Sequence, residues 1–192
     1  ILILLSIINS QQSLESLTPT ELLSMLKISD FTLSPNGQYL IISIKKWNPD
    51  TGKSYTHLQY KNLQTNETKV LTPNIEGQSD ISPHFSSSFP NILFFQRTSP
   101  GTKSSIYYIS FPPEEDTITQ DKSIKLTDYI LPINDFKIKA KTILFSTEVY
   151  FNCKTMKCSA DLIEKEEKQD YQVYLLVQLN VKKLEIIFYC QQ

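Results

Sequence analysis

The residues that could carry out hydrolysis do not form the pattern of a common catalytic site. An α/β-type serine hydrolase raises its nucleophile on a Gly-x-Ser-x-Gly turn. The chain has four glycines, and none of them lies in such a motif; residues 77–80 and 101–104 lack its second glycine. His57 falls in an expected strand and His84 in a turn-to-strand segment, and we expect structural roles for both. There is no glycine-rich phosphate loop either, so we predict no catalytic residue and no cofactor in this chain.

Three cysteines are present, and two of them are close in sequence. Cys153 and Cys158 enclose a short polar stretch, a spacing that allows a small-loop disulfide in an oxidising compartment. A zinc site would need four ligands, and both histidines are far away in the sequence. We therefore predict a disulfide between Cys153 and Cys158 and no metal site.

The first residues indicate export. Residues 1–8 are almost entirely apolar and residues 9–13 are polar. The apolar run is too short to cross a bilayer as a helix, which needs roughly twenty residues, but it has the length of a signal-peptide core. We predict a truncated signal peptide over residues 1–12, because neither a Met nor a basic segment precedes the run; a buried N-terminal strand is the alternative. No other segment is long and apolar enough to span a membrane.

Two further observations concern partners and modification. The chain has 19 basic and 20 acidic residues, a balance that gives no reason to expect nucleic-acid binding. Asn66 begins an Asn-Glu-Thr sequon in a polar turn and is a glycosylation candidate. Such sequons also occur by chance, so Asn66 adds modest support to a secreted or endolysosomal location.

The elements begin with a helix and continue as strands. Thr18, Pro19 and Glu21 form a helix start with a capping box, and the helix should end near residues 28–30. Strands are then expected over residues 31–33, 39–44, 55–63 and 68–72, with an Asn-Gly hairpin turn at residues 34–37 and a second turn at residues 48–52.

This set of strands recurs along the chain. Residues 84–87 take the place of 32–35, residues 91–96 that of 39–44, and a third unit opens at residue 133. The period is roughly fifty to fifty-five residues, as in four-stranded propeller blades. We therefore predict an all-β fold, an incomplete β-propeller with about two four-stranded blades and part of a third; a β-sandwich is the alternative. A charged helix capped by Ser159 is expected over residues 159–168, with its mixed charges facing solvent.

The segment from Leu17 to Tyr39 resembles the opening of the prolyl oligopeptidase family of serine peptidases, within the dipeptidyl-peptidase V and acylaminoacyl-peptidase branch. A capped "L-T-P-E-D-L" helix there leads through "I-S-D-P" to "S-P-D-G-K-Y". This chain departs from that pattern with Phe31 in place of Pro and Asn36 in place of Asp.

Residues 144–153, Cys158, the charged helix and residues 171–177 are also similar to secreted members of that branch, which carry an "F-S-x-E-V-Y-P-D-C" segment. After Val177 the family would show "R-H-W-D", and this chain does not. The likeness covers residues 15 to 177. We therefore divide the chain into the signal remnant (1–12), a partial propeller (13–177) and a divergent tail (178–192).

The resemblance implies that the propeller belongs to a serine-type dipeptidyl peptidase. In that family it covers a separate α/β-hydrolase domain, which supplies the catalytic Ser, Asp and His, and it restricts which peptides reach them. None of those three residues can be carried over to this sequence, so the chain by itself should be inactive. The alternative is a non-enzymatic TolB-like propeller that acts as a binding module. The oligomeric state is not predicted.

Overall fold

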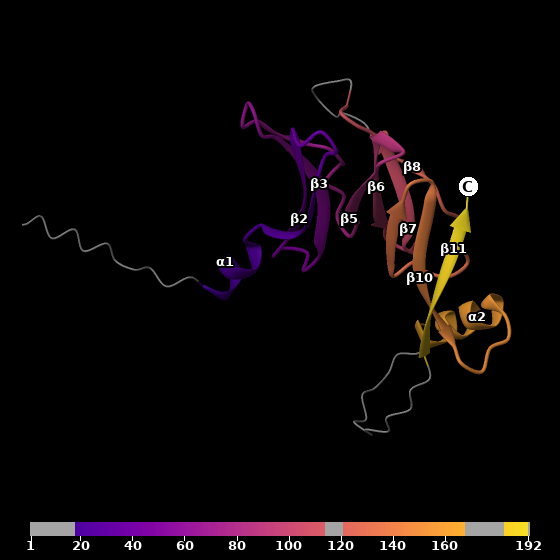
Figure 1. Cartoon of the computed structure of the whole chain (residues 1–192). Helices are drawn as coiled ribbons and strands as arrows, with labels where there is room; N and C mark the ends of the chain where they lie inside the picture. The colour runs from indigo at the N-terminus through magenta and orange to yellow at the C-terminus, as the bar shows by residue number, and fades with distance from the viewer. Residues whose placement is uncertain (1–17, 114–120, 168–182, 192) are drawn as a thin grey trace, which may run out of the picture.

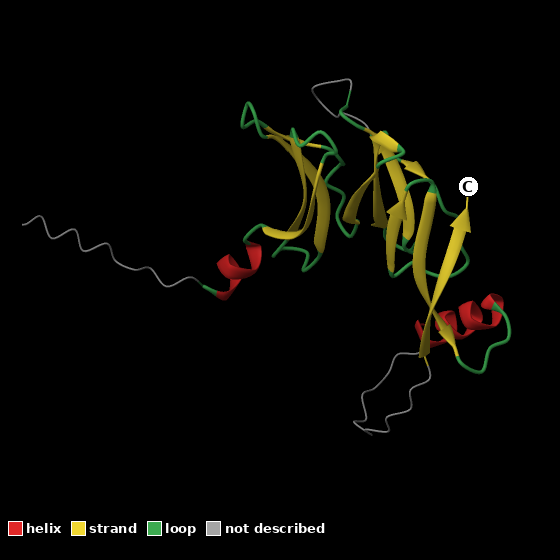
Figure 2. Cartoon of the chain, in the orientation of Figure 1, coloured by secondary structure: helices red, strands yellow, loops and turns green. Residues whose placement is uncertain are grey.

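The computed structural model describes residues 18–113, 121–167 and 183–191. Strands dominate it, as Figure 2 shows, and only two helices are present in the described residues. They are α1 (Pro19–Ser24) and α2 (Met156–Glu167). The predicted all-β class is confirmed. The predicted signal remnant and residues 171–177 lie outside the described residues.

The strands form three successive antiparallel units, which we call blades 1, 2 and 3. Blade 1 consists of β1 (Lys27–Leu33), β2 (Tyr39–Trp47), β3 (Ser54–Asn62) and β4 (Thr68–Val70). Blade 2 consists of β5 (Ser79–Ser86), β6 (Phe89–Thr98), β7 (Ser105–Ser110) and β8 (Ile124–Lys125). Blade 3 consists of β9 (Asp135–Lys139), β10 (Thr142–Tyr150) and β11 (Lys183–Gln191). Figure 1 shows the blades arranged side by side along an arc, with α1 and α2 near the two ends.

Local chemistry sets the turns within a blade. Gly37 has φ +70°, the left-handed conformation that its place in the Asn-Gly turn requires. Its N–H donates to Ser34 O at 2.9 Å, and the Ser34 side chain accepts from Tyr39 N–H at 2.9 Å. The predicted turn at residues 34–37 is confirmed. The Thr18 capping box is also present, since Thr18 and Glu21 each accept a backbone hydrogen bond from the other.

Neighbouring blades pack through apolar side chains on their faces. Ile41, Leu58 and Tyr60 of blade 1 meet Leu93 and Phe95 of blade 2 in one buried cluster. A second cluster joins blade 2 to blade 3, and a third lies beneath α2. Blades 1 and 2 are also linked by one parallel pair, Thr56 with Ser79, where Thr56 N–H donates to Gln78 O. The core therefore lies between the blades.

Blade 1 exposes large apolar residues on the side that faces away from blade 2. Phe31 and Leu33 of β1 are 67% and 52% exposed. They pair with Ile42 and Leu40 of β2, whereas Ile41, between those two, points into the cluster shared with blade 2. Because side chains alternate along a strand, Phe31 and Leu33 lie with their partners Ile42 and Leu40 on one continuous face of the sheet.

Three details of the sequence prediction are wrong. The first helix ends at Ser24, before residues 28–30, because Lys27 and Ile28 already pair with β2.

The second error is a shift of one residue in the alignment of blade 2 with blade 1. The predicted alignment of residues 91–96 with 39–44 makes Leu93 the counterpart of Ile41, whereas in the structure that counterpart is Phe94. Thr32 pairs with Ile41 and His84 with Phe94, and the register shift beside Phe85 adds one residue to that hairpin.

The third error concerns Ser159, which does not cap the charged helix. Ser159 is 1% exposed and lies inside α2, where its hydroxyl accepts a hydrogen bond from Tyr150 N–H at 3.0 Å. The Thr155 hydroxyl instead accepts from Cys158 N–H at 3.2 Å. Thr155 precedes the first helical residue, so it occupies the capping position.

Candidate functional site

Titratable side chains gather where the first strands of the three blades meet. β1 contacts β5, and β5 in turn contacts β9. Asp30 comes from β1, His84 from β5, and Asp135 and Lys137 from β9. We call these four residues the first-strand cluster. It brings together groups that are far apart in sequence because the first strand of each blade lies next to that of the following blade.

His84 is at the centre of this cluster. Its Nε2 atom lies 3.4 Å from Lys137 Nζ, and its ring packs edge-on against Phe136 with 5.2 Å between the centroids. Burial lowers the pKa of His84, and Lys137 lowers it further, while Asp30 and Asp135 act in the opposite direction. The lowered pKa favours the neutral imidazole, whose Nε2 atom can accept a hydrogen bond from Lys137 Nζ.

The two aspartates occupy matching places in their strands. Asp30 Oδ1 accepts a hydrogen bond from Phe31 N–H, and Asp135 Oδ1 accepts one from Phe136 N–H, each at 2.8 Å. Within the described part of the chain, no hydrogen bond is made to the second oxygen of either carboxylate. The cluster thus offers two anionic acceptors and one cationic donor, a set suited to binding the charged groups of a peptide.

The other histidine, His57, is buried in β3. It is 4% exposed, its Nε2 lies 2.8 Å from the Gln59 side-chain nitrogen, and no described residue bonds its Nδ1. Burial lowers the pKa of His57, with a smaller contribution from Lys46. Its ring packs against that of Tyr55.

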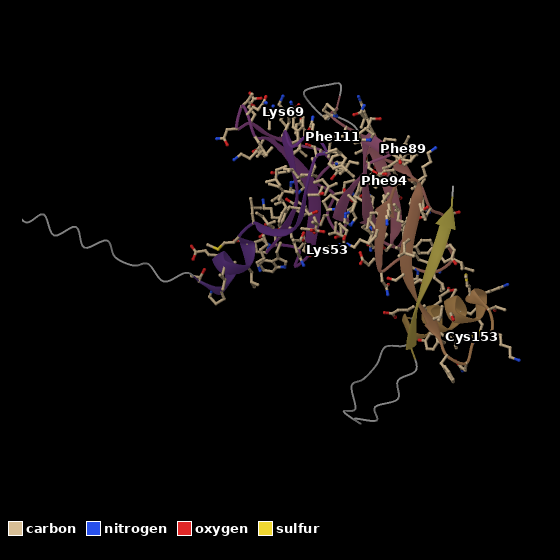
Figure 3. The ribbon with its side chains drawn as sticks, in the orientation of Figure 1. Lys53, Lys69, Phe89, Phe94, Phe111 and Cys153 are labelled. Carbon is tan, nitrogen blue, oxygen red and sulfur yellow. A yellow bond between two sulfur atoms is a disulfide. The ribbon has the colours of Figure 1, made fainter. Side chains whose placement is uncertain are left out.

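A disulfide joins Cys153 to Cys158, with the sulfur atoms 2.04 Å apart. It ties the end of β10 to the first turn of α2, below blade 3 in Figure 3. Cys190 lies in β11. Across the residues that the structure describes, there is no group of three or more His, Cys, Asp or Glu side chains placed to hold a metal ion.

Asn66 lies in the turn between β3 and β4 and is exposed. It has φ +64°, and its N–H donates to Asn62 O at 2.9 Å. Its glycosylation stays a prediction. No described helix is long and apolar enough to cross a membrane.

Sequence reasoning missed the first-strand cluster. His84 was assigned a structural role, and Asp30, Asp135 and Lys137 were not singled out. The one available signal was the dipeptide Asp-Phe, which opens both the first and the third unit as Asp30-Phe31 and Asp135-Phe136. That repetition placed two carboxylates at equivalent positions, but it did not show that His84 and Lys137 lie beside them.

Comparison with solved structures identifies the architecture. AtxE2 isopeptidase matches 90% of this chain with a TM-score of 0.56 and 16% identity, and an acylaminoacyl peptidase of Pyrococcus horikoshii matches 69% with a TM-score of 0.51 and 14% identity. The matching regions are propeller domains. The chain is an incomplete β-propeller. It spans 30% of the isopeptidase and 19% of the acylaminoacyl peptidase. No protein-family model and no curated protein matches the sequence.

Proposed function

We propose that this chain is the propeller part of an exported serine-type dipeptidyl peptidase. A separate α/β-hydrolase domain would supply the catalytic serine, and the propeller would control which peptides reach it. Two likenesses support this proposal. The fold is similar to the propellers of an isopeptidase and an acylaminoacyl peptidase, and residues 17–39 resemble the opening of a dipeptidyl-peptidase branch.

The observation that carries the proposal is the first-strand cluster. In a propeller the first strands of successive blades surround the central channel, so this is the surface that a peptide in the channel would meet. Lys137 and Asp135 are exposed, and His84 and Asp30 are half-buried beside them. A peptide carries an ammonium and a carboxylate group at its ends, and the cluster offers a partner for each.

The strength of such contacts decides what they can do. Two unit charges 4 Å apart gain about 1 kcal/mol in water and about 4 kcal/mol near a protein surface. Contacts of this strength would bind and orient a short peptide and still allow it to dissociate. A folded protein, which is wider than the central channel of a propeller, would be excluded.

Export is the second part of the proposal. The Cys153–Cys158 disulfide suits an oxidising compartment, and Asn66 stands exposed in its turn. The apolar run at residues 1–8 is consistent with passage through a secretory pathway.

The test uses the complete product of the gene in which this sequence lies. Hydrolysis of a dipeptidyl aminomethylcoumarin is measured for the wild type, for Lys137→Ala and for Lys53→Ala. Lys53 is the matched control, because it lies in the turn between β2 and β3 and is not part of the first-strand cluster. We expect turnover that a fluorophosphonate abolishes, and about a five-fold rise in KM for Lys137→Ala alone, the loss of about 1 kcal/mol.

Two outcomes would contradict the proposal. A complete product without fluorophosphonate-sensitive turnover would indicate a non-enzymatic propeller. Equal kinetics for Lys137→Ala and Lys53→Ala would show that the first-strand cluster does not contact the substrate.

A further inference from the structure

A pocket of about 280 Å³ lies between blades 1 and 2, apart from the first-strand cluster. It is formed by the turn between β1 and β2, the start of β6 and the segment that follows β7. Figure 3 shows Phe111 near the end of the blades that carries Lys69, opposite the end that carries Lys53. The residues that line the pocket are Ser34, Pro35, Asn36, Tyr39, Pro90, Asn91, Phe111 and Pro112.

Aromatic rings form a fixed inner wall of this pocket. Phe111 is 3% exposed, and its ring packs edge-on against Tyr39 and Tyr60, with centroids 5.3 and 5.5 Å away. Tyr39 also packs against Tyr60. Because the rings hold one another in place, the wall exists before any ligand binds, which lowers the ordering cost of binding.

Prolines and neutral side chains form the rest of the lining. Pro35, Pro90 and Pro112 are exposed at its rim, and none of the eight lining residues carries a charge. A charged group bound there would lose hydration without gaining a partner of opposite charge. This lining would therefore suit a neutral, largely apolar group.

Two polar groups at the pocket are not used elsewhere in the described structure. The Asn36 side chain is occupied, since its Oδ1 accepts from Ser34 Oγ at 2.7 Å and from Gln38 N–H at 3.1 Å. By contrast, neither the Tyr39 hydroxyl nor the Asn91 carboxamide is hydrogen-bonded to another described residue. Each can donate a hydrogen bond to a carbonyl oxygen.

We propose that this pocket binds an extended, proline-containing peptide segment. Proline rings suit a neutral wall of tyrosine, phenylalanine and proline, and proline has no N–H group that would be left unpaired in the pocket. A polyproline II segment also presents unpaired backbone carbonyls, which Tyr39 and Asn91 can bind. Its conformation exists before binding, so little entropy is lost on docking.

The size of the pocket limits the contact to one or two residues. Ligand pockets that enclose a whole small molecule measure about 300–1,000 Å³, so this pocket is just below that range. It would hold one proline ring and a neighbouring carbonyl, with the rest of the peptide crossing the rim. The binding should therefore be weak and selective for proline.

Fluorescence anisotropy of the full chain with a labelled peptide tests the proposal. The probe is Gly-Pro-Pro-Gly-Pro-Pro with fluorescein at its N-terminus, and Gly-Ala-Ala-Gly-Ala-Ala with the same label is its control. Tyr39→Phe removes only the hydroxyl, and Asn91→Ala removes only the carboxamide. Tyr55→Phe is the matched control, since Tyr55 lies in β3 and does not line the pocket.

We expect the proline peptide to bind at least five-fold more tightly than the alanine peptide. Tyr39→Phe and Asn91→Ala should each weaken it about five-fold, the effect of one lost hydrogen bond, and Tyr55→Phe should leave it unchanged. Asn91 is exposed and its side chain supports no described contact, so Asn91→Ala keeps the test valid even where Tyr39→Phe lowers the melting temperature.

Three results would overturn the proposal. They are absence of binding at millimolar peptide, equal binding of the two peptides, and binding that neither pocket variant weakens. This inference does not depend on peptidase activity, because the measurement involves no hydrolysis.

Discussion

Removing the Arg97 side chain of β6 should strongly destabilise blade 2. Its guanidinium makes two hydrogen bonds to Asp80, from Nε to Oδ1 at 2.6 Å and from Nη2 to Oδ2 at 2.8 Å. Nη1 donates to Ser123 Oγ at 2.6 Å and also contacts Asp121. The guanidinium carbon lies 5.2 Å from the centre of the Phe95 ring and 5.0 Å from that of Tyr107.

The size of the expected loss in stability follows from the burial of both side chains. The Asp80 side chain is fully buried and that of Arg97 is 5% exposed. Burial raises the pKa of Asp80, and the hydrogen bonds from Arg97 oppose that rise. Arg97→Met would leave the Asp80 carboxylate buried without its cation, which costs about 3–5 kcal/mol. Replacing both residues by apolar ones, as in Arg97→Met with Asp80→Leu, removes the unpaired charge and should recover most of that loss.

Urea unfolding followed by circular dichroism measures these differences. We expect Arg97→Met to lower the free energy of unfolding by about 3–5 kcal/mol, with about 2–3 kcal/mol of coupling between the two sites in the double-mutant cycle. Lys125→Met, which removes an exposed ion pair with Asp128, is the control and should leave the midpoint unchanged. An Arg97→Met variant as stable as the wild type would contradict this expectation, as would a double variant whose loss of stability equals the sum of the two single losses.

Two further predictions concern pH and modification. Because burial lowers the folded-state pKa of His57 and of His84, the unfolded chain takes up protons first as the pH falls. The free energy of unfolding should be highest above about pH 6.5 and should decline below it. The urea midpoint of the wild type should therefore fall between pH 7.5 and pH 5.5, and that of His57→Gln should fall less. A midpoint that rises on acidification would contradict this expectation. In a secretory host, the chain fused to an intact signal peptide should carry a glycan at Asn66, seen as a mobility shift that a glycosidase removes and that Asn66→Gln abolishes. A shift that persists in Asn66→Gln would place the glycan elsewhere.

The features that could be predicted from the sequence depend on neighbouring residues. The Thr18 capping box and the turn at Gly37 each need only a few residues of the right type in order. The division of the chain into successive blades could also be predicted from the sequence, because the same order of turns and strands recurs along it. Local chemistry was therefore enough for the first helix start, the turn at residues 34–37 and the fold class.

The remaining features depend on contacts between distant segments. Ser159 has the chemistry of a helix cap, but Tyr150 N–H binds its hydroxyl and Thr155 caps the helix instead. The one-residue shift beside Phe85 is a property of the pairing between β5 and β6, and it reverses which of Leu93 and Phe94 faces blade 1. The first-strand cluster joins three blades, so no single segment of sequence could reveal it.

The most direct test of the proposed peptide-gating propeller is a substrate-length profile of the complete gene product. Unstructured peptides of increasing length and one folded protein are incubated with it, and cleavage is followed by mass spectrometry with and without a fluorophosphonate. The account predicts inhibitor-sensitive cleavage of short peptides, a steep fall in rate with length, and an intact folded protein. Cleavage of the folded protein at a rate comparable to that of the short peptides would contradict it, as would the absence of inhibitor-sensitive cleavage of any peptide.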